Sequence, residues 1–207
     1  MIDRAGELKA AAEGIAPAAL QAAKDAIAAS CAEHIRWADI FASRLEGLPE
    51  EELHQFVRAF SLTLLGHLPT RPGTCPFCIQ YGDDRGCTGC GYAATHGRCD
   101  EDDSAFSIFI EAFQELGKMI FQESIPGSIF CRQNSVDIKR DLHFQIMGSL
   151  NLAREMSKSL LSLPAMQLME AKKSYIRQMI EYMPIGILSD DVRRQHLIVQ
   201  DSLERYW

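Results

Sequence analysis

The chain has 207 residues, of which 47% are hydrophobic and 24% are charged. These proportions are ordinary for a globular protein and allow one sizeable core. Its net charge of −7, from 21 basic and 28 acidic residues, argues against a dedicated nucleic-acid-binding protein, which usually carries a basic stripe. No apolar run approaches the roughly 20 residues of a membrane-spanning helix. The N-terminus also lacks the basic and apolar regions of a signal peptide, so we expect a cytoplasmic protein.

The N-terminal part of the chain predicts two helices. Residues 6–34 are rich in alanine, and Pro17 suits the first turn of a helix that begins near residue 15 or 16. The stretch "EGLPEEELHQF" ends this helix at Gly47 and opens a second one at Pro49. The second helix presents Leu53, Phe56, Phe60 and Leu64 at helical spacing.

Four further helices are predicted after residue 100. One follows "DEDDSAF", with Asp100, Asp102 or Asp103 as its cap, and its wide apolar stripe predicts a central helix that is buried on most sides. Of the other three, one covers about 135–163, one begins at Pro164, and the last begins after Ser189 or Asp190. The short basic groups in "EAKKSYIR" and "DVRRQH" are interrupted by acids, which favours solvated helix faces.

The fold class predicted by these patterns is all-α. We expect a helical bundle of about six helices in a single domain, 1–207. A small cysteine-rich insert, 72–100, lies between the second and third helices, where six glycines interrupt the helical period. No internal repeat is visible.

The insert contains five of the seven cysteines, in the run "CPFCIQYGDDRGCTGCGYAATHGRC". Cys75 and Cys78 form one C-x2-C pair, and Cys87 and Cys90 form a second. Two residues between thiolates allow a tight turn to direct both sulfurs to one point, and two such turns provide a tetrahedral four-sulfur site. In the cytoplasm, paired cysteines of this kind indicate a metal site more often than disulfides.

This run resembles a zinc ribbon, a small zinc module built from two cysteine knuckles, over residues 75–91 only. Pro76 and Gly91 match the usual residues around those knuckles. The resemblance implies a zinc ion bound by Cys75, Cys78, Cys87 and Cys90. Between the pairs, Ile79 and Tyr81 favour strand and residues 82–86 favour a turn, which predicts a short hairpin.

Two further candidate ligands, His96 and Cys99, follow the pairs. Cys99 is either spare, which we expect because both pairs are complete without it, or replaces a knuckle cysteine. His96 is an additional ligand or donates a hydrogen bond to a cysteine sulfur. An iron–sulfur cluster also takes four thiolates, but the spacing matches neither ferredoxin pattern, so zinc is favoured. "CPFC" alone resembles the dithiol of thioredoxin-like proteins, but the strand–helix alternation of that fold is missing.

Two functions agree with these features. The first is a non-catalytic zinc-binding accessory protein that binds a protein partner and assists assembly or maturation of an enzyme, in the manner of the helical chaperones of redox enzymes. The alternative is an iron–sulfur or redox-active metal protein for electron transfer, redox sensing or metal delivery. We expect neither nucleic acid nor membrane as a partner, and self-association into a homo-oligomer stays open. No phosphate loop, nucleophile elbow or dinucleotide fingerprint is present in the sequence.

Overall fold

The computed structural model describes residues 4–82, 87–124 and 134–206, and within these ranges no residue is in a β-strand. The all-α class is therefore confirmed. The predicted hairpin is wrong for Ile79 and Tyr81, which lie in a short helix, while residues 83–86 of its predicted turn lie outside the described residues.

The described residues form nine α-helices, compared with the expected number of about six. Six have 14 residues or more: α2 (Pro17–Leu45), α3 (Leu53–Gly66), α6 (Ala105–Gln122), α7 (Ser135–Ser159), α8 (Ala165–Glu181) and α9 (Asp190–Tyr206). Three are short: α1 (Arg4–Glu13), α4 (Pro76–Tyr81) and α5 (Gly91–His96). Single 3-10 turns occupy η1 (Glu50–Glu52), η2 (Pro72–Thr74), η4 (Leu160–Ser162) and η5 (Ile185–Ile187).

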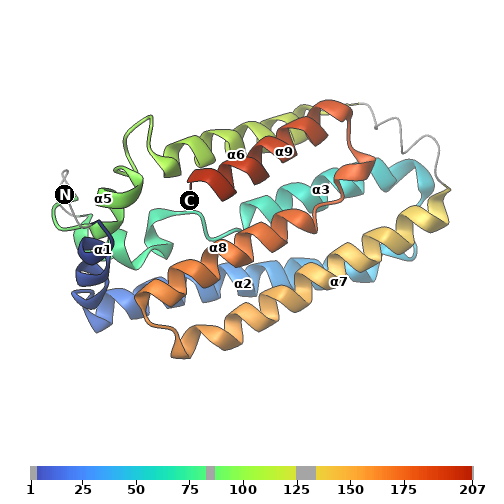
Figure 1. The fold of residues 1–207 in the computed structure, drawn as a ribbon. Helices are drawn as coiled ribbons and strands as arrows, with labels where there is room; N and C mark the ends of the chain where they lie inside the picture. Colours follow the sequence, from blue (N-terminus) through green and yellow to red (C-terminus); the bar gives the residue numbers. More distant parts are fainter. Residues whose placement is uncertain (1–3, 83–86, 125–133, 207) are drawn as a thin grey trace.

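The long helices lie side by side along one direction (Figure 1). The most extensive contacts join α2 to α7 and α6 to α9, and α7 also packs on α8. Helices α1 and α5 pack together at one end, next to the start of α2 (Figure 1). At the other end, α3 begins near the point where α6 stops and the chain turns from α8 into α9 (Figure 1).

Local sequence explains where these helices begin. Pro17 lies in the first turn of α2, as predicted, and the helix begins at Pro17 itself, because Ala16 before it is extended. Helix α7 begins after Asn134, whose side-chain oxygen accepts from the backbone N–H of Asp137 at 2.8 Å. Helix α6 is capped by Ser104, which accepts from Ser107 at 3.1 Å, and not by one of the predicted aspartates.

The main core runs between the long helices. The apolar residues that recur at helical spacing along α7, Leu142, Ile146, Leu150, Ala153 and Met156, are all buried. Helix α6 differs from the prediction of a central helix, because only three of its side chains are fully buried and its outer side is exposed. The three buried residues of α6 are Phe109, Leu116 and Ile120.

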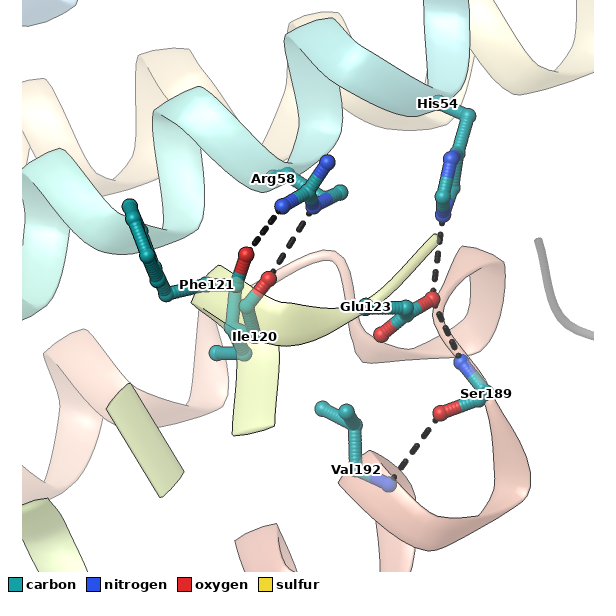
Figure 2. A network of polar contacts seen from close by, with 7 residues as sticks. All are labelled: His54, Arg58, Ile120, Phe121, Glu123, Ser189 and Val192. Carbon is teal, nitrogen blue, oxygen red and sulfur yellow. Dashed lines mark hydrogen bonds and ion pairs between the residues drawn. The ribbon is translucent and has the colours of Figure 1, made fainter. Parts of the chain in front are cut away.

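A polar network ties together the end at which α3 begins (Figure 2). Oε1 of Glu123 accepts from His54 Nε2 and from the Ser189 backbone N–H, both at 3.0 Å. The Ser189 hydroxyl accepts from the Val192 N–H at 3.4 Å and so caps α9. Arg58 donates to the last carbonyls of α6, at Ile120 and Phe121. We call this group of side chains, His54, Arg58, Glu123 and Ser189, the His54 end.

None of the described helices combines the length and the apolar character needed to cross a lipid bilayer.

Candidate metal centre

The first cysteine pair stands at the start of α4. Cys75 precedes the helix and Cys78 is its third residue, so a single turn brings the two side chains to one side. The turn before them is fixed by Thr74, whose hydroxyl lies 2.8 Å from the Pro69 carbonyl and 2.6 Å from the Arg71 carbonyl. Cys75 is buried, and Cys78 is half-buried.

The second pair forms the tight turn that the C-x2-C spacing predicts. The N–H of Cys90 donates to the Cys87 carbonyl at 3.0 Å. Gly89 at the third position has φ of 80°, and Cys87 has φ of 48°. A positive φ is inexpensive for glycine, while at Cys87 it costs free energy that the surroundings must offset. Cys90 then precedes α5 in the same way as Cys75 precedes α4.

Helix α1 covers this segment. A Cβ atom on Gly91 would lie 2.5 Å from the Glu7 carbonyl oxygen, so glycine permits the close approach of α5 to α1. The Tyr81 hydroxyl donates to the Ala11 carbonyl at 2.8 Å. Cys75 and Phe77 belong to a small apolar cluster that also includes residues of α1 and α8. These contacts hold both cysteine pairs against the same end of the long helices.

A buried lysine lies among the first thiols. Lys172, in the middle of α8, is only 1% exposed. Its Nζ lies 3.3 Å from Thr74 Oγ1 and 3.4 Å from the Thr74 carbonyl. Together with Cys75, Cys78 and Cys99 it lines a cavity of about 20 Å³, which is enough for one water-sized sphere.

The thiols around this cavity shift one another's pKa values. Hydrogen bonding to Cys78, and then burial, raises the pKa of Cys75 well above its usual value. The hydrogen bond with Cys75 lowers the pKa of Cys78. The hydrogen bond with Cys99 and the burial of Cys78 outweigh that effect, and together they raise the pKa of Cys78 to about 12. The bond from Cys78 lowers the pKa of Cys99. Burial lowers the pKa of Lys172, and the three thiols oppose that shift.

The second pair lines a separate, open hollow. Cys87, Cys90 and Arg98 line it together with small residues of α1 and α5, and its volume is about 710 Å³. Arg98 is ion-paired to Asp100 at 2.8 Å. Burial raises the pKa of the Cys90 thiol, although the backbone N–H groups of Ala93 and Tyr92 favour its thiolate.

The six predicted site residues therefore do not all lie around one space. Cys75, Cys78 and Cys99 share one cavity, and Cys90 packs with the first two in the small apolar cluster. Cys87 lies on the side of the open hollow. His96 stacks on Tyr92, with ring centroids 4.1 Å apart, and its Nδ1 bonds to the Thr95 hydroxyl. His96 is not among the described residues that line the cavity or the hollow.

Lys172 is not among the predicted site residues, because the alternation of acids and bases around "EAKKSYIR" favours a solvated helix face. The signal was present: Lys172 is four residues from both Leu168 and Ile176, which are buried on the same face of α8. A basic residue on the apolar stripe of a helix indicates a buried charge that needs a partner.

Within the described ranges, no group of three His, Cys, Asp or Glu side chains forms a ready metal-binding arrangement. Comparisons with protein-family models, with curated proteins and with solved structures gave no match to this chain.

Proposed function

We propose that this chain is a zinc-binding helical accessory protein that acts through a protein partner. The observation that carries the proposal is the gathering of cysteine thiols beside the buried ammonium of Lys172. Thiolates are the preferred protein ligands of zinc in sites without catalytic activity, and four of them close the tetrahedron. Binding requires that the thiols lose their protons and turn toward the ion, so its affinity increases with pH.

The charge balance supports this choice of ligand chemistry. An ammonium group that is buried without negative charge nearby is costly. Zinc with four thiolates carries a net charge of −2, which the Lys172 ammonium partly compensates. The small cavity between Lys172 and the thiols accepts an object no larger than a water molecule.

The accessory role rests on the surface of the long helices. Phe144 on α7 is 70% exposed and lies beside Tyr182, with ring centroids 6.4 Å apart. Both line an open hollow of about 430 Å³ with polar groups such as Gln145 and Gln178. Exposed aromatic rings with polar neighbours are typical of protein contact sites.

Elemental analysis of protein purified anaerobically without chelator tests the metal part. We expect one zinc per chain and no absorption in the visible range. The absence of any stoichiometric metal would overturn the proposal.

A photo-crosslinking residue at position 144 tests the partner part, with position 33 on the exposed side of α2 as control. A defined partner crosslinked from 144 and not from 33 supports the role. Crosslinks only between copies of the chain indicate a homo-oligomer, and crosslinks from neither position, or equally from both, contradict the proposed surface.

An iron–sulfur or redox-active centre is the second candidate. The observation in its favour is that five thiols gather where a structural zinc site needs four, and that two of them face an open hollow. Brown protein with iron and acid-labile sulfide would establish this function in place of zinc.

A further inference from the structure

The two spaces beside the cysteines divide the five thiols of the segment. Cys75, Cys78 and Cys99 line the small cavity that also contains Lys172. Cys87 lines the open hollow, next to Arg98. A tetrahedral thiolate site takes four sulfurs, so one of the five has to be left out.

Cys90 belongs to the inner group through its packing. It contacts the apolar cluster that contains Cys75 and Cys78, although it also borders the open hollow. Its position is fixed by the neighbouring Gly91, where α5 approaches the backbone of α1 too closely for a side chain. The described cysteines of this apolar cluster are Cys75, Cys78 and Cys90. Neither Cys87 nor Cys99 belongs to it, but Cys99 lines the small cavity with the first pair, whereas Cys87 lines the open hollow.

Lys172 marks the inner side of the site. Its ammonium group is held near the first pair by Thr74, which directly precedes Cys75. A cation at this place stabilises a centre whose ligands add up to more negative charge than the ion carries. It lines the same cavity as Cys75, Cys78 and Cys99, and none of these four is among the described residues that line the open hollow.

We propose that a divalent metal ion is bound by Cys75, Cys78, Cys90 and Cys99, that Lys172 compensates the charge of this centre, and that Cys87, at the open hollow, does not bind the ion. The inference rests on the proposed metal binding and changes the ligand set that the zinc-ribbon resemblance implies. Cys99 replaces Cys87, although the two C-x2-C pairs look complete without it.

Competition between the full chain and a chromophoric chelator for Zn²⁺ tests the ligand set. We expect Cys99→Ser to weaken zinc binding by more than about a hundredfold, because a lost ligand costs more than the 10–100-fold of an outer contact. Cys87→Ser is expected to leave the affinity nearly unchanged. The reverse order, or an equal loss in both variants, overturns the assignment. A wild-type chain that binds no zinc fails at the earlier step and overturns the proposed function as well.

Alkylation gives a second measurement that does not depend on affinity. In the zinc-loaded wild-type chain, iodoacetamide should modify Cys87 quickly and leave Cys75, Cys78, Cys90 and Cys99 protected, as read by peptide mass spectrometry. After removal of zinc, all five should react. Protection of Cys87 together with rapid modification of Cys99 contradicts the proposal.

The role of Lys172 is tested by Lys172→Met, which keeps the length and apolar stem of the side chain. We expect zinc affinity to fall by about 10–100-fold, as for other groups that act on a metal through its ligands. Lys172→Arg keeps the charge, so it should lose less zinc affinity than Lys172→Met. Lys173→Met is the control, because it removes one charge from the adjacent position and should leave the zinc affinity unchanged. Circular dichroism confirms that each variant is folded. Equal affinity in Lys172→Met and Lys173→Met overturns this role.

Discussion

The two ends of the long helices both bury ionisable groups, but they satisfy them differently. At the His54 end, the Glu123 carboxylate accepts hydrogen bonds from His54 of α3 and from the N–H of Ser189, which directly precedes α9 (Figure 2). Arg58 donates to the last carbonyls of α6. At the cysteine end, defined by the five thiols of residues 75–99 and Lys172, the Lys172 ammonium lies 3.3 and 3.4 Å from the oxygens of Thr74 and shares a cavity with three thiols.

The difference separates a structural network from a candidate site. Charged groups that are paired within the protein stabilise the fold without any ligand. Thiols that ionise beside a lysine balance its charge, and a bound metal ion is the usual cause of thiol ionisation near neutral pH. We therefore expect changes at the His54 end to act on global stability and changes at the cysteine end to act on metal binding.

The largest effect is expected from Glu123→Leu. It leaves the His54 Nε2 and Ser189 N–H groups without their acceptor, which should lower the free energy of unfolding by about 3 kcal/mol. In a chain of this size, that corresponds to a melting temperature lower by roughly 6–12 °C. Zinc affinity should not change.

Two control variants accompany Glu123→Leu. Glu123→Gln retains one acceptor oxygen, so its free energy of unfolding should fall less than that of Glu123→Leu. Glu115→Leu, on the exposed side of α6, the helix that Glu123 directly follows, should stay within about 0.5 kcal/mol of wild type. Equal thermal melts for Glu123→Leu and Glu115→Leu would show that the network does not support the fold.

The sequence predicts the periodic parts of the molecule well and the long-range parts poorly. Leu142, Ile146 and Leu150 could be assigned to a buried face because the period of a helix is a local property. The place of Lys172 depends on what packs against its helix, and the segment that meets it is about 70–100 residues earlier in the chain. Periodicity contains no information about such a contact.

The same reasoning applies to the site. The turn at Cys87 and Cys90 follows from the spacing of the pair, and the structure has it. The grouping of Cys99 with Cys75 and Cys78 depends on how the chain returns after α5, with Gly97 at φ of 80°. The cap of α6 is similar: several residues that can cap a helix stand in a row before it, and which of them accepts from the first turn, here Ser104, depends on how the chain enters the helix.

Acid should weaken the middle of the bundle, between the two ends. His34 on α2 is 1% exposed and its Nε2 lies 3.0 Å from the Ser149 hydroxyl of α7. Burial, and then the neighbouring His67, lowers the pKa of His34 from 6.5 to about 4. The unfolded chain therefore binds this proton first, so stability is complete above pH 6.5 and is lost as the pH falls toward 4.

The loss from His34 amounts to at most about 3 kcal/mol. Urea unfolding at a series of pH values measures it. His34→Leu removes the titration, so the stability difference between wild type and variant should change by this amount between pH 7 and pH 4. A constant difference would show that His34 does not titrate in this range. The same urea curves show how a loss of stability of the whole chain looks, and local effects at the cysteine end can be compared with them.

Removal of metal should act locally. With zinc removed, or in the double variant Cys75→Ser and Cys78→Ser, we expect protease cleavage within residues 72–100. Helices α1, α4 and α5 contain only ten, six and six residues, so even their complete loss leaves most of the helical circular dichroism. Loss of most of that signal would show that the metal also organises the long helices and that the two ends are not independent.

The smallest effect is expected from Gly91→Ala, which tests how α1 covers the cysteine end. The added Cβ would lie 2.5 Å from the Glu7 carbonyl oxygen and 2.6 Å from the Leu8 Cα, and backbone atoms cannot turn away as a side chain can. Helix α1 should therefore move off α5 and become open to proteolysis within residues 4–13, while the melting temperature changes little. Gly117→Ala is the matched control, because nothing lies within 4 Å of its Cβ position and alanine in a helix stabilises by about 0.5–1 kcal/mol. If α1 is no more sensitive to protease in Gly91→Ala than in Gly117→Ala, the close contact does not hold α1 in place, and the cover of the cysteine end must depend on the Tyr81 hydroxyl and the apolar cluster instead.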